Sequence, residues 1–157
     1  MAKFFIGVLA LIISTLVGHN FSLKQKRQLE FYEEFKRFNS SLKRNIQFRK
    51  DNLINLLNYD CKNDDFICTL KSAKLIITGI SKEEICLPEY ITDKDFFNRF
   101  FCNIGYGNGI NELNFLCEYE DELNEKLLKI KDNYSKLSSL YDKLGFSFGM
   151  VVMILIL

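Results

Sequence analysis

The stretch LNFLCEYEDELNEKLLKIKDNYSKLSSLYDKL, from Leu113 to Leu144, decides the fold of this chain. Its seam positions recur alternately three and four residues apart, and all of them except Glu120 are apolar. They are Leu113, Leu116, Glu120, Leu123, Leu127, Ile130, Tyr134, Leu137, Tyr141 and Leu144. This spacing is typical of a helix that packs through one stripe, as in a coiled coil. Because no Pro or Gly lies between Asn111 and Leu144, one helix is predicted from the glycine-rich turn before it to the C-terminus.

The two ends of the chain are its most apolar parts. Phe4–Val17 and Leu144–Leu157 are each 14 residues without a charge. Such a run makes about 21 Å of helix, which is shorter than the ~30 Å hydrocarbon core of a bilayer, so flanking residues must contribute to a span. The sequence therefore predicts transmembrane helices over residues 1–22 and 143–157, with a helical bundle over residues 23–142 between them.

Basic residues next to these ends predict their orientation. Lys24, Lys26 and Arg27 follow the first apolar run, and Lys136 and Lys143 precede the second. Positive residues close to membrane helices favour the cytoplasmic side, so the middle of the chain is expected in the cytosol and both termini on the far side. The cysteines fit this side: there are five, an odd number, without metal-ligand spacing, and we expect reduced, mostly buried thiols.

A different class of protein shares these features. Lys3 followed by an apolar run also resembles a signal peptide, although no A-x-A-like cleavage site follows. The alternative is therefore a secreted or surface helical protein without enzymatic activity, which has a cleaved signal, a C-terminal membrane tail and partly disulfide-bonded cysteines.

The middle of the chain has helical periodicity throughout. A single apolar stripe predicts a first helix over about Leu23–Phe48, and its members are Phe31, Phe35, Phe38, Leu42 and Ile46. Shorter helices are expected after caps at Asp51 and at Asp64 or Asp65, the latter closed by Gly79. Three-residue-spaced pairs at Ser81 and Glu84, and at Thr92 and Asp95, predict two more helices on either side of Pro88. Gly105–Glu112 is expected to be a turn between helices.

Charge is distributed unevenly although the net charge is only +1. Residues 24–50 hold nine basic and three acidic side chains, and residues 112–142 hold four basic and eight acidic ones, which gives +6 and −4. Opposite signs favour antiparallel packing of these two helices in one chain, with self-association as the alternative use of the seam. The surplus positive charge can attract an acidic partner or anionic lipid headgroups, while the small net charge gives no argument for nucleic-acid binding. The candidate partner-binding residues are Arg37, Lys43, Arg44, Arg49 and Lys50.

Small residues lie within both apolar ends. Gly145 and Gly149 form a G-x-x-x-G pattern, and Ser14 and Gly18 form the looser version with two small residues. Such spacing allows two membrane helices to approach closely, so these four residues are candidates for helix packing.

The sequence offers no catalytic constellation. Its one histidine, His19, is at the edge of the first apolar run without an acidic neighbour in sequence, and there is no H-E-x-x-H, nucleophile elbow or P-loop. We expect neither an enzyme nor a bound metal or cofactor.

The ending LYDKLGFSFGMVVMILIL, from Leu140 to Leu157, resembles that of the stage III sporulation protein AB family of endospore-forming bacteria. Gly18 with the following Arg27 and Leu29 is similar to the family's N-terminal region, as are Ile46 and Phe48 before a short helix. The resemblance implies an all-α, membrane-anchored bundle similar to the platform domains of type II secretion. It implies a place in the mother-cell membrane, in the channel apparatus between mother cell and forespore. The implied partners are the stage III sporulation AA-type ATPase and other membrane proteins of that complex.

Overall fold

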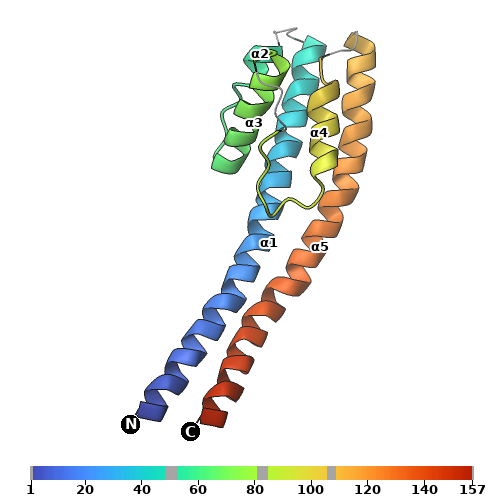
Figure 1. The fold of residues 1–157 in the computed structure, drawn as a ribbon. Helices are drawn as coiled ribbons and strands as arrows, with labels where there is room; N and C mark the ends of the chain where they lie inside the picture. The colour runs from blue at the N-terminus through green and yellow to red at the C-terminus, as the bar shows by residue number, and fades with distance from the viewer. Residues whose placement is uncertain (1, 49–52, 81–84, 106–108, 157) are drawn as a thin grey trace. The chain divides into compact units, whose positions relative to one another are not determined.

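Helices account for the regular structure of the chain. The computed structural model describes residues 2–48, 53–80, 85–105 and 109–156. Within these ranges there are five helices and no strand (Figure 1). The helices are α1 (Ala2–Phe48), α2 (Leu53–Leu56), α3 (Asp64–Ile77), α4 (Lys94–Asn103) and α5 (Gly109–Ile156). The predicted all-α fold with an apolar helix at each end is confirmed.

Two long helices contain the ends of the chain. α5 has 48 residues and begins near the predicted start, so the prediction of one helix through the seam and the apolar tail is confirmed. α1 has 47 residues and runs without a break through residue 22, where the sequence analysis separated two segments. Both helices contain an apolar stretch long enough to cross a membrane.

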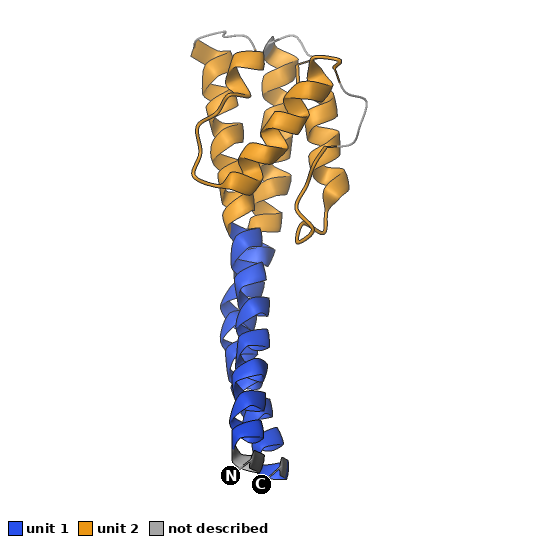
Figure 2. Cartoon of the chain, turned by 60° about the vertical axis from the view of Figure 1, so that its left-hand side comes forward, with its two compact units in different colours: residues 1–29, 128–157 blue, residues 30–127 orange. Residues whose placement is uncertain are grey.

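The chain divides into two compact units (Figure 2). One unit, which we call the helix pair, consists of residues 1–29 and 128–157. The other, which we call the bundle, consists of residues 30–127. The predicted membrane boundaries at residues 22 and 143 concern the lipid surface and stay predictions.

Aromatic side chains form the core of the bundle. The centre of the Phe35 ring lies 4.7–6.1 Å from the centres of four phenylalanine rings of α4, and the rings meet edge to face. Such aromatic contacts add to the free energy gained by burying the rings. The rings of α4 are those of Phe96, Phe97, Phe100 and Phe101, all of them buried. The apolar stripe predicted for the first helix is buried from Phe31 to Leu42, and α5 contributes Leu116 and Leu123.

The caps of α3 and α4 differ from the prediction by one residue. Asn63, with extended backbone, accepts a hydrogen bond from Phe66 N at 3.0 Å, so the predicted caps Asp64 and Asp65 are wrong. Asp93, and not Thr92, accepts from Phe96 N at 3.3 Å. A side-chain oxygen before the first turn satisfies a free N–H group there, and an acidic residue within the turn is favoured by the helix dipole, so neighbouring polar residues compete for the cap.

Two of the shorter predicted helices need revision. α2 has only four residues, and its predicted cap Asp51 lies outside the described residues. The predicted pair Ser81 and Glu84 also lies outside them, and residues 85–93 contain a turn at Pro88 but no helix. Gly79 closes the segment after α3 with a φ of 73°, which glycine adopts without strain.

Candidate functional site

The helix pair is built around close backbone contacts between α1 and α5. Each step of three or four residues forward along α1 is matched by a similar step backward along α5, so the two helices are antiparallel. A Cβ atom placed on Gly18 would lie 2.6 Å from the Tyr141 carbonyl oxygen, and one on Gly145 would lie 2.9 Å from that of Ser14. A Cβ on Gly149 would lie 2.9 Å from Leu11 Cα. The four predicted packing residues thus lie together in one seam, where a larger side chain has no room.

The polar groups of the first apolar run have partners within the helix pair. Ser14 Oγ donates a hydrogen bond to the Gly145 carbonyl oxygen of α5 at 2.7 Å. Thr15 Oγ1 donates to the Leu11 carbonyl oxygen, one turn earlier in α1, also at 2.7 Å. An unsatisfied hydroxyl is costly in a hydrocarbon environment, and these two hydroxyl groups are satisfied without water.

The outward faces of the helix pair are apolar. Among the large side chains, Leu9 is 61% exposed, Phe148 66% and Ile154 68%. Of the most apolar window in each helix, only 11% of the residues are buried. The other large exposed side chains of α1 within the helix pair are Phe5, Ile6, Ile12, Ile13, Leu16, Val17, Phe21 and Leu23. A soluble monomer rarely exposes an apolar surface this extensive, which favours contact with lipid.

One ion pair and one aromatic contact join α1 to α5 in the helix pair. His19 Nδ1 lies 3.6 Å from Asp142 Oδ1, and both side chains are more than half exposed. The rings of Phe21 and Tyr141 stack with their centroids 5.7 Å apart. Aromatic and ionisable side chains gather at membrane–water interfaces, so we expect such an interface where these four residues lie.

A second candidate site is a groove on the bundle, which we call the basic groove. It has a volume of about 530 Å³ and is lined by Glu33, Lys36, Arg37, Ser40, Arg44 and Tyr59. The five residues from α1 are separated by steps of one, three or four and therefore share one face of the helix. Two of the predicted docking residues, Arg37 and Arg44, thus face the same groove.

One arginine of the basic groove pairs with a carboxylate outside the lining. Arg37 Nη1 donates to Glu34 Oε2 at 3.1 Å, and the Arg37 side chain remains 66% exposed. Burial, and then the negative charge of Glu34, raise the pKa of the Tyr59 hydroxyl, which therefore stays neutral at physiological pH. Among the described residues no ion pair involves Lys36 or Arg44. Lys36 and Arg44, together with Arg37, give the groove a positive character.

The other predicted docking residues lie elsewhere. Lys43 forms an ion pair with Glu120 of α5 inside the bundle, and this hydrogen bond raises the pKa of the lysine. Its ammonium group is therefore engaged in holding α1 against α5, as predicted for these two helices of opposite charge. Arg49 and Lys50 lie outside the described residues. Lys36, Ser40 and Tyr59 were not predicted. The helical spacing of Lys36 and Ser40 with Arg37 and Arg44 does place these four residues on one face of the helix.

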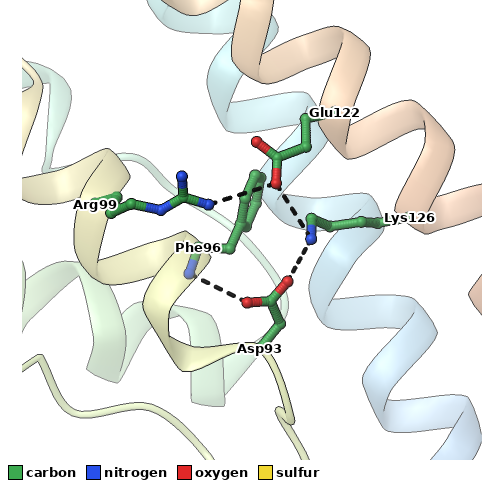
Figure 3. Close-up of polar contacts among 5 residues, drawn as sticks. All are labelled: Asp93, Phe96, Arg99, Glu122 and Lys126. Carbon is green, nitrogen blue, oxygen red and sulfur yellow. Dashed lines mark hydrogen bonds and ion pairs between the residues drawn. The ribbon is translucent and has the colours of Figure 1, made fainter.

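An ion network joins α4 to α5 in the bundle (Figure 3). Lys126 of α5 pairs with Asp93, the cap of α4, and with Glu122 at 3.2 Å, while Arg99 approaches Glu122 at 3.6 Å. The Lys126 ammonium also lies 4.9 Å from the centre of the Phe96 ring. Burial alone lowers the pKa of Lys126, but the hydrogen bonds that its ammonium donates to Asp93 and Glu122 outweigh this effect, and the pKa lies above its ordinary value. This network connects the start of α4 to α5.

The cysteines are more accessible than predicted. Cys68, Cys86, Cys102 and Cys117 are exposed and Cys61 is half-buried, so the expectation of mostly buried thiols is wrong. The core positions are occupied by phenylalanine and leucine side chains, which gain more from burial than the smaller thiol does. Within the described ranges no three His, Cys, Asp or Glu side chains gather as a metal ion would require.

Comparison of the chain with protein-family models, with curated proteins and with solved structures finds no match.

Proposed function

We propose that the chain is a membrane-anchored platform protein whose helix pair spans the cell membrane and whose bundle docks a cytosolic partner. The observation that supports this proposal is the distribution of polar and apolar groups in the helix pair. The hydroxyl of Ser14 bonds to the partner helix and that of Thr15 to the backbone of its own helix, while many large apolar side chains are exposed. This arrangement is unfavourable in water and favourable in lipid.

The sidedness follows from the charges next to the apolar runs. Lys24, Lys26 and Arg27 on α1, and Lys136 and Lys143 on α5, favour a cytosolic bundle with both termini across the membrane. The antiparallel pairing of α1 with α5 is compatible with this topology, because both apolar ends lie in one unit.

The proposed partner presents an acidic surface to the basic groove. Lys36, Arg37 and Arg44 form a positive set on one face of α1, against the single carboxylate of Glu33 in the lining. Complementary charge accelerates association and selects the partner. On the resemblance described above, we propose that the partner is the stage III sporulation AA-type ATPase and that the protein is a component of the mother cell–forespore channel apparatus, held next to other membrane proteins of that complex.

Thiol labelling tests the topology. All five cysteines belong to the bundle, so a membrane-impermeant maleimide should label none of them in intact cells and the four exposed ones after lysis. A cysteine appended after Leu157 in a cysteine-free chain is the matched control and should react in intact cells. Labelling of the bundle in intact cells, together with loss of the N-terminal residues by mass spectrometry, would instead support the secreted alternative.

Charge reversal tests the docking surface. The double variant Arg37→Glu/Arg44→Glu should reduce retention of the ATPase in a pull-down by about tenfold or more, because close charge pairs at interfaces contribute ~1.5 kcal/mol or more each. Lys71→Glu, an exposed reversal on α3, is the control and should leave retention unchanged. Equal retention by the double variant and the wild-type protein would exclude the basic groove as the docking site.

A further inference from the structure

Cys86, in the segment between α3 and α4, is hydrogen-bonded to α3 through its backbone. The Cys86 N–H group donates to Ser72 Oγ at 3.0 Å, and the Cys86 carbonyl oxygen accepts from Thr69 Oγ1 at 2.9 Å. Thr69 is fully buried, and Ser72 Oγ in turn donates to the Thr69 carbonyl oxygen at 2.8 Å. These bonds hold Cys86 against one turn of α3.

Cys68 lies on the same turn of α3. Cys68 and Ser72 are four residues apart, so their side chains emerge on the same face with Cβ atoms about 5–6 Å apart. The Cys86 thiol is close enough to Cys68 to contribute to the raised pKa of the Cys68 thiol. Both residues are exposed and both thiols are free. A disulfide requires Cα atoms about 4.4–6.8 Å apart, so its two cysteines must lie on adjacent segments. Thr69 follows Cys68 directly and Ser72 is one turn further along α3, so the two hydrogen bonds hold Cys86 next to the turn that carries Cys68.

We propose that Cys68 and Cys86 form a redox-modification site, at which a low-molecular-weight disulfide oxidises the two thiols to an intramolecular disulfide. The thiolate of one cysteine attacks the oxidant RS–SR, so that a mixed disulfide forms and RS⁻ leaves and takes up a proton. The second thiol loses its proton and attacks the cysteine sulfur of the mixed disulfide, which releases the second RSH. Two electrons and two protons pass from the cysteines to the oxidant, which becomes two thiols.

The surroundings of the pair determine how fast it reacts. Burial and the neighbouring thiol raise the pKa of Cys68, so its thiolate is scarce at neutral pH and oxidation accelerates as the pH rises. The new bond would close a loop between α3 and the segment before α4, and it depends on the bundle alone, whatever partner the bundle docks. Disulfides of this kind stabilise mainly by restricting the unfolded chain.

The test uses the full chain in detergent micelles, treated with oxidised glutathione at pH 8 and then analysed by intact mass and peptide mapping. We expect a species about 2 Da lighter than the reduced chain, with the peptides of Cys68 and Cys86 joined, and a thermal midpoint raised by roughly 5–10 °C. Reduction with dithiothreitol should reverse both changes. Cys102→Ser, which removes an exposed thiol on α4, is the matched control and should keep both.

The variants Cys68→Ser and Cys86→Ser should each lose the lighter species and instead retain glutathione on the remaining thiol. Their reduced forms should melt with the reduced wild-type protein, which shows that the bundle still folds. Persistence of the lighter species in either variant, or glutathione adducts alone on the wild-type chain, would overturn the proposal.

Discussion

At the scale of the residue, Tyr32 shows how the bundle constrains a polar group. Its side chain is almost completely buried at 2% exposed, and its ring lies 5.1 Å from that of Phe97. Burial, together with the negative charge of Asp93, raises the pKa of its hydroxyl to about 12. The hydroxyl therefore remains neutral well above the pH at which an exposed tyrosine ionises.

This shift predicts alkaline destabilisation. Between pH 10 and pH 12 the unfolded chain loses the Tyr32 proton while the folded chain keeps it, so the free energy of unfolding falls as the pH rises, by roughly 2–3 kcal/mol over this range. Below pH 10 the Tyr32 hydroxyl is protonated in both the folded and the unfolded chain, so it no longer makes the free energy of unfolding depend on pH. Urea unfolding of the bundle at pH 8, 10 and 12 measures this dependence.

Tyr32→Phe removes this titration and should be less sensitive to pH over the same range, with a change below about 1 kcal/mol at pH 8. Tyr134→Phe, on the part of α5 that belongs to the helix pair, is the control and should keep the wild-type dependence. Equal alkaline loss in the wild-type and Tyr32→Phe proteins would show that the hydroxyl is not responsible.

At the scale of the element, α4 depends on one carboxylate with two roles. Asp93 caps the helix through Phe96 N and also pairs with Lys126 of α5. Loss of an N-cap costs about 0.5–2 kcal/mol, and a partly exposed ion pair contributes about 0.2–1 kcal/mol. The two roles can be separated because asparagine caps a helix but has no charge.

We therefore expect Asp93→Ala to lower the free energy of unfolding by about 1–3 kcal/mol and Asp93→Asn by less than about 1 kcal/mol, measured by urea unfolding at pH 7. Asp95→Ala, in the first turn of the same helix, changes the same charge without removing the cap. If Asp93→Ala is no more destabilising than Asp95→Ala, the cap contributes nothing measurable.

Lys126 of α5, which pairs with the cap of α4, adds a second pH dependence in the same direction as that of Tyr32. Its folded pKa lies above the ordinary value, so the stabilisation is complete at neutral pH and is lost as the pH rises through the folded pKa. Lys126→Met should therefore be destabilising at pH 7 and nearly neutral in strongly alkaline solution.

The close packing of α1 against α5 requires glycine at the positions where the two backbones meet. Gly18→Leu and Gly145→Leu place a bulky group where even a Cβ lies within 3 Å of a carbonyl oxygen. Overpacking of this kind costs about 1–3 kcal/mol, and we expect the two helices to separate at lower sodium dodecyl sulfate concentration. Distances between spin labels on Leu9 and Val151 would report the separation. Ser147→Leu, on an exposed position of α5, should have no effect.

For the molecule as a whole, the helix pair exposes more apolar surface than a soluble monomer usually does, and the proposed membrane anchor makes a prediction from it. We expect the full-length chain to sediment with membranes, to resist extraction by carbonate and to dissolve only with detergent. A monomer that stays soluble at micromolar concentration without detergent would contradict the membrane anchor, and a detergent-free oligomer would instead point to burial of these faces between copies.

Local patterns were enough for the helices but not for their contacts. The stripe from Phe31 to Leu42 predicted the buried face of α1, because period and burial are linked within one helix. The docking residues are predicted from charge and expected exposure, and neither shows whether a lysine meets a carboxylate from a distant helix. Lys43 was therefore counted as accessible although it pairs with Glu120, and Lys36 and Tyr59 were missed.

The all-α class, the two apolar ends, the unbroken last helix and the aromatic face of the first helix could be predicted, because each is encoded by residues a few positions apart. Only the tertiary structure decided that Ser14 meets the Gly145 carbonyl, that Asp93 meets Lys126 and that Cys86 rests on the turn of Cys68. These contacts depend on the register between distant segments, which is set by packing of the whole chain and not by any local period.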